Sequence, residues 1–129
     1  MRRLVFAAVL VLALPTILEA QLPDGWRIRA DRPGADLTEV VFTEMPPGWH
    51  VTTGPAVILY RPDMQAGGAY RVEMEVFLFD PGGRREAFGF FLGGAHLEGE
   101  GQRYTYFLIR DGGQFLVKSR DGRETATLV

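Results

Sequence analysis

Cysteine is absent from the 129-residue chain, and serine occurs only once, at Ser119. Without cysteine the chain forms no disulfide and no thiolate metal site. A domain of this composition must hold together by core burial, for which it has nine Phe, four Tyr and two Trp. Ser119 does not lie in the strand–turn–helix context of a nucleophilic serine. The sequence therefore excludes a disulfide scaffold and gives no support to a serine hydrolase.

Long hydrophobic runs are also missing, except at the N-terminus. Met1-Arg2-Arg3 precedes an apolar run from Leu4 to Leu18, and Ala20 follows it. This order is typical of a signal peptide, and the run is shorter than the roughly 20 residues of a membrane-spanning helix. We predict a signal peptide over residues 1–20, a single domain over 21–129 and no membrane span after cleavage. An uncleaved anchor is the alternative.

An excess of positive charge is the third absence. The net charge of the chain is −2, and no basic tract follows the leader. Nucleic-acid binding proteins carry a basic surface that neutralises phosphates, so we expect no nucleic-acid partner. A cysteine-free exported domain fits a bacterial cell envelope better than a eukaryotic secreted module. We predict a secreted or periplasmic bacterial protein.

Alternation of apolar and polar residues, broken by glycine and proline, fills the mature chain. Residues Ala69–Phe79 form the longest such segment, and Phe88–Gly93 is apolar throughout, as in a central strand. The paired prolines predict a loop over 44–48. The triplets Arg-Asp-Gly at 110–112 and 120–122 predict successive hairpins of a meander. The expected strands are 25–30, 37–43, 49–53, 56–60, 69–79, 88–93, 103–110, 114–119 and 124–129.

This many short strands and no helical period predict an all-β antiparallel sandwich. The last predicted strand, 124–129, is apolar and ends the sequence. An apolar terminal strand leaves an edge that pairs readily. Two interpretations stay open: the sandwich is truncated at its C-terminus, or the edge strand pairs with a second chain.

The order of the later segments resembles that of a known superfamily. A long alternating strand (70–79), a Gly-Phe-type strand (88–93), Tyr-x-Tyr-Phe-x-Ile-Arg (104–110) and Phe-Leu-Val-Lys (115–118) follow one another. This order resembles the middle of a concanavalin A-like lectin/glucanase jelly roll over roughly residues 40–129. Within that superfamily it is most similar to bacterial exported 3-keto-disaccharide hydrolase domains and to laminin G-like modules. The resemblance implies a jelly-roll sandwich and a saccharide ligand. The acidic triplet of the glucanases is missing, so their mechanism is not implied.

Glu73 and Glu75 are the weak catalytic candidates. Two residues apart on one strand, their side chains would lie about 7 Å from each other, from a rise of about 3.3 Å per residue. Glycoside hydrolysis uses a carboxylate pair at such a separation. The alternative is that both line the solvated face of the strand beside Arg71.

Glu98 and Glu100 are the weak metal candidates, in the loop His96-Leu97-Glu98-Gly99-Glu100. Their carboxylates and backbone carbonyls could supply the six to eight oxygens that Ca²⁺ takes. The alternative is a solvated acidic turn without a cofactor.

Five residues are candidates for binding a glycan. Aromatic rings stack on the apolar faces of sugars, while Arg and His side chains bond their hydroxyls. The candidates are Trp49, His50, Arg103, Tyr104 and Tyr106. The alternative is that the aromatic residues fill the core of a small sandwich.

The sequence therefore favours a domain that binds carbohydrate without catalysis in the cell envelope. A sugar-active hydrolase of the 3-keto-disaccharide type is one alternative. A structural domain that assembles through its edge strand is the other.

Overall fold

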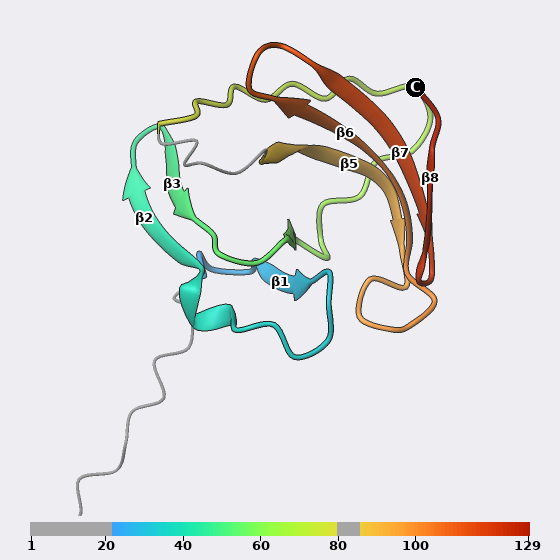
Figure 1. The fold of residues 1–129 in the computed structure, drawn as a ribbon, viewed down its shortest axis with the longest axis horizontal. Helices are drawn as coiled ribbons and strands as arrows, with labels where there is room; N and C mark the ends of the chain where they lie inside the picture. The colour runs from blue at the N-terminus through green and yellow to red at the C-terminus, as the bar shows by residue number, and fades with distance from the viewer. Residues whose placement is uncertain (1–21, 80–85) are drawn as a thin grey trace, which may run out of the picture. The chain divides into compact units, whose positions relative to one another are not determined.

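The computed structural model describes residues 22–79 and 86–129 (Figure 1). Its described residues contain eight strands in antiparallel sheets, one 3-10 helix and no α-helix, so the all-β class is confirmed. The predicted signal peptide lies outside these residues. Within them, no helix has the length and apolar character needed to cross a membrane.

The chain divides into two compact units, which meet in the sequence between Pro62 and Asp63. Each unit is described by itself below. The single domain expected over 21–129 stays a prediction.

The first unit consists of two nested antiparallel pairs. Strand β1 (Arg27–Ala30) pairs with β4 (Val57–Tyr60), and β2 (Val41–Met45) pairs with β3 (Gly48–Thr52). The hairpin β2–β3 therefore lies between the two strands of the other pair in the sequence. Val40, which leads into β2, is fully buried. The strands expected near 25–30, 49–53 and 56–60 are thus confirmed.

The loop expected over Glu44–Gly48 is shorter than predicted. Met45 pairs with Gly48, and the cis-linked Pro46–Pro47 alone form the turn of the β2–β3 hairpin. Proline has no backbone N–H to give to a ladder, so the turn is the place in this hairpin where both prolines fit. The strand residues on either side continue up to the prolines.

The strand expected over 37–43 is only half correct, because Leu37–Glu39 form the 3-10 helix η1. Asp36 caps this helix: its carboxylate accepts hydrogen bonds from the Thr38 backbone N–H at 2.9 Å and from the Thr38 hydroxyl at 2.5 Å. Aspartate side chains compete with extended structure in this way. Both hydrogen bonds favour the ionised carboxylate and so hold the pKa of Asp36 below its ordinary value. The bond from the Thr38 hydroxyl has the larger effect, and the bond from the Thr38 backbone N–H the smaller one.

The second unit contains a four-stranded meander. Its strands are β5 (Ala87–Ala95), β6 (Arg103–Arg110), β7 (Phe115–Asp121) and β8 (Glu124–Thr127), hydrogen-bonded in that order (Figure 1). The hairpins predicted from the two Arg-Asp-Gly triplets are therefore confirmed. The central position predicted for 88–93 is wrong, because β5 is an edge strand of this sheet.

The largest departure from the sequence prediction is at Ala69–Phe79. None of residues 61–79, all of which the structure describes, belongs to a strand, and every residue from 70 to 79 is exposed. The chain there is still locally extended: the rings of Phe77 and Phe79 stack 6.4 Å apart, and Arg71 forms an ion pair with Glu73. The side chains alternate as in a strand, but no ladder joins the backbone to a neighbour. Because this segment does not pair with β5, β5 is left at the edge.

Candidate binding surface

The register of the four-stranded sheet assigns each of its residues to one of two faces, because directly paired residues of neighbouring strands lie on the same face. Pairing runs from Phe91 to Tyr106, and from Tyr106 to Lys118. We call this side the tyrosine face and the other the phenylalanine face. The tyrosine face consists of Ala87, Gly89, Phe91, Tyr104, Tyr106, Leu108, Arg110, Leu116, Lys118, Arg120, Thr125 and Thr127. The phenylalanine face consists of Phe88, Phe90, Leu92, Arg103, Thr105, Phe107, Ile109, Phe115, Val117, Ser119, Asp121, Glu124 and Ala126.

The phenylalanine face carries a ladder of stacked rings. Phe107 lies between Phe90 and Phe115, with ring centroids 5.6 Å from each. Phe115 remains 53% exposed. A sheet face this apolar is one that a second layer usually covers.

The tyrosine face carries a second, less regular aromatic cluster. The ring of Tyr104 lies 5.1 Å from that of Phe91 and 5.4 Å from that of Tyr106. Tyr104 is only 7% exposed, whereas Tyr106 and Phe91 are half-buried. Tyr104 therefore supports its neighbours, and Tyr106 offers more of its ring to solvent.

Each tyrosine holds a cation from the neighbouring strand. The Lys118 ammonium lies 5.9 Å from the ring centre of its cross-strand partner Tyr106, and the Arg120 guanidinium lies 6.0 Å from that of Tyr104. Cations at this distance are attracted to the negative face of the ring. Arg120 also donates from Nη1 to the carbonyl of Gly122 at 3.4 Å. Two adjacent tyrosine–cation pairs are thereby fixed on one face of the sheet.

Charges are sorted between the two faces. Arg110, Lys118 and Arg120 are the charged residues of the tyrosine face, and all three are basic. Both acidic residues of the four strands, Asp121 and Glu124, lie on the phenylalanine face. The tyrosine face of these strands is therefore positive, although the chain as a whole is acidic.

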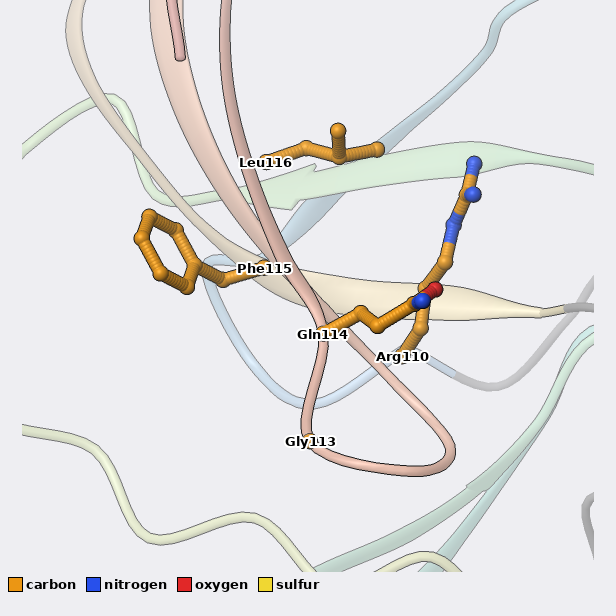
Figure 2. A pocket seen from close by; sticks show the side chains of 5 residues that line it. All are labelled: Arg110, Gly113, Gln114, Phe115 and Leu116. Atoms are coloured by element: carbon orange, nitrogen blue, oxygen red, sulfur yellow. The ribbon is translucent and has the colours of Figure 1, made fainter.

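A hollow of about 460 Å³ lies at the β6–β7 hairpin, lined by Arg110, Gly113, Gln114, Phe115 and Leu116. Figure 2 shows the Arg110 and Gln114 side chains close together, with the ring of Phe115 pointing away from Leu116. The Nε atom of Arg110 is buried and has no hydrogen-bond partner among the described residues. The hollow thus places a half-buried guanidinium at the hairpin end of the tyrosine face.

The predicted glycan-binding residues do not all come together. Tyr104 and Tyr106 share the tyrosine face, but Arg103 lies on the opposite one. Trp49 and His50 belong to β3 of the first unit, where they pair with Glu44 and Thr43. Trp49 is 46% exposed and His50 is half-buried; as consecutive strand residues they lie on opposite sides of β3.

The predicted catalytic and metal candidates lie outside the sheet. Glu73 and Glu75 are in the exposed segment 69–79, where Glu73 is bound to Arg71. Glu100 lies in the loop between β5 and β6 and forms an exposed ion pair with Arg123 at 3.0 Å. Glu98 lies in the same loop. Within the described residues, no group of three or more His, Cys, Asp or Glu is arranged to hold a metal ion. Calcium binding and catalysis stay predictions.

The sequence analysis missed Phe91, Arg110, Lys118 and Arg120 as members of this surface. A usable signal was present, because the turn at 111–113 fixes which residues of 103–110 and 114–119 are opposite one another. Counting back from that turn pairs Tyr106 with Lys118 and Tyr104 with Arg120.

Comparison of the chain with protein-family profiles, curated proteins and solved structures found no match. The interpretation of the surface therefore rests on its own geometry.

Proposed function

We propose that this chain is a carbohydrate-binding domain that acts without catalysis in the bacterial cell envelope. The observation that supports it most directly is the grouping of Tyr106, Lys118 and Arg120 on one half-buried sheet face. A sugar offers an apolar C–H face and a ring of hydroxyls. Half-exposed rings beside charged donors match both parts of such a ligand.

The remaining parts of the proposal are a sandwich fold and export. A second sheet packed on the phenylalanine face would complete a jelly-roll sandwich and bury the stacked rings of Phe90, Phe107 and Phe115. The arginine-led apolar run at 2–18 supports export through a cleaved leader.

A glycan array probed with the full chain tests this function, after circular dichroism has shown that the protein is folded. We expect reproducible binding to at least one saccharide class and a loss of about tenfold in affinity for Tyr106→Ala, as for a stacking residue worth about 1.4 kcal/mol. Thr105→Ala is the matched control, because Thr105 is the exposed neighbour of Tyr106 on the opposite face.

The same array with a chelator tests the calcium prediction at Glu98 and Glu100. Loss of binding without calcium would support a metal in that loop. A folded chain that binds no saccharide, or equal losses for Tyr106→Ala and Thr105→Ala, would overturn the proposed function.

A further inference from the structure

The charge of the tyrosine face narrows the class of saccharide that it fits. Lys118 makes no ion pair within the described residues; its ammonium lies beside the ring of Tyr106. A cation held on an aromatic ring keeps its full charge, since the ring supplies no counter-ion. A half-buried charge that has no counter-ion among residues 22–79 and 86–129 favours an anionic ligand.

Arg110 extends this surface to the other end of β7. Its buried Nε atom has no hydrogen-bond partner in the part of the chain that the structure describes, and its side chain lines the hollow at the hairpin. Arg110 lies opposite Gln114 in the ladder, and from Lys118 to Gln114 the strand covers about 13 Å, at a rise of about 3.3 Å per residue. The apolar residues Leu108 and Leu116 lie between the two basic ends. A ligand that meets both ends must therefore be longer than a single sugar ring.

We propose that the tyrosine face binds an acidic oligosaccharide, whose carboxylate or sulfate groups contact Lys118 at one end and Arg110 at the other. This inference rests on the proposed function and specifies its ligand. Nucleic acid fits the same face less well, because three basic residues on a chain of net charge −2 neutralise few phosphates.

Isothermal titration of the full chain with three oligosaccharides of equal length tests the inference: oligogalacturonate, a sulfated oligosaccharide and neutral galacto-oligosaccharide. We expect at least one acidic ligand to bind about tenfold more tightly than the neutral one, with an advantage that shrinks as salt rises from about 0.05 M to 0.5 M. Comparison of the two acidic ligands shows whether the surface prefers carboxylate or sulfate groups.

Lys118→Gln should weaken binding of the acidic ligand about fivefold, the upper range for a partly exposed ion pair. It should weaken binding of the neutral ligand by less, because the glutamine amide can still donate a hydrogen bond to a hydroxyl. Lys118→Arg, which keeps the positive charge, should bind the acidic ligand as tightly as the unsubstituted chain does. Arg103→Gln removes one positive charge from the opposite face and should change neither, so it separates a local contact from the effect of net charge.

The outcomes separate the two proposals. Neutral and acidic sugars that bind equally well would overturn this inference and leave the proposed function standing. Equal losses for Lys118→Gln and Arg103→Gln would also overturn it, as would single-stranded DNA that binds as tightly as the acidic sugar. Absence of binding by all three sugars would overturn this inference, whereas the proposed function is overturned only if the glycan array also shows no binding.

Discussion

Strand β6 and the segment 69–79 have similar alternating sequences in the same unit, yet only β6 is paired. β6 is hydrogen-bonded to a strand on each side, and its Tyr104 is buried. In the segment, Tyr70 is 51% and Phe77 is 71% exposed. The difference shows that alternation determines which side chains share a face, whereas pairing depends on a partner strand in register. For β6 the turn at 111–113 supplies that partner directly.

Amide hydrogen exchange should show the largest contrast between the two regions. We expect the amides of β6 to exchange at least about a thousandfold more slowly than those of residues 70–79. An amide hydrogen-bonded in the ladder exchanges only after an opening that costs about 4 kcal/mol or more in free energy, whereas an unpaired amide exchanges without any opening. The second central strand, β7, serves as the control for slow exchange. Equally slow exchange in residues 70–79 would show that this segment is paired in solution.

Gly89→Ala should disrupt the pairing of β5 with β6. A Cβ atom at Gly89 would overlap the backbone carbonyl oxygen of Phe107 in β6, so the two strands would have to separate locally. We expect a loss of about 3 kcal/mol in the free energy of unfolding, measured by urea denaturation.

Gly101→Ala is the matched control, because a Cβ there meets no atom within 4 Å. Similar unfolding midpoints for both variants would contradict the close approach of β5 and β6 at this point.

The same substitution in each region gives the smallest but most direct comparison. Phe107→Ala removes a ring stacked between two others and should lower the free energy of unfolding by about 2 kcal/mol, less than a fully buried phenylalanine because the face is only half covered. Phe77→Ala should cost less than about 0.5 kcal/mol, as for other exposed positions. Equal losses in thermal or urea unfolding would show that the segment 69–79 is packed.

Where a short turn joins two alternating segments, the sequence was enough to predict the strands and their pairing. This holds for the two hairpins that join β6, β7 and β8. It fails at Leu37–Glu39, where a single hydrogen-bonding side chain, Asp36, turns the backbone into a 3-10 helix. It also fails at 69–79. The alternation there does not identify a strand with which the segment could pair, and a ladder forms only where such a strand is present.

The candidate surface was predictable only in part for a related reason. Tyr104 and Tyr106 stand out within one strand, and their shared face follows from alternation alone. Lys118 and Arg120 join them only through the register of a second strand. Arg103 adjoins Tyr104 in sequence and so appeared to belong with it, but neighbouring residues of a strand point to opposite sides.

The separation of charge across the sheet has a consequence for the speed of encounter. The strands carry three positive charges on the tyrosine face, against one positive and two negative charges on the phenylalanine face. This arrangement is an electric dipole along the normal of the sheet. A protein with such a dipole is turned by the field of a charged surface before contact, and its association rate rises at low ionic strength. An anionic polymer would therefore make its first contact with the tyrosine face of this sheet, even though the net charge of the chain repels it.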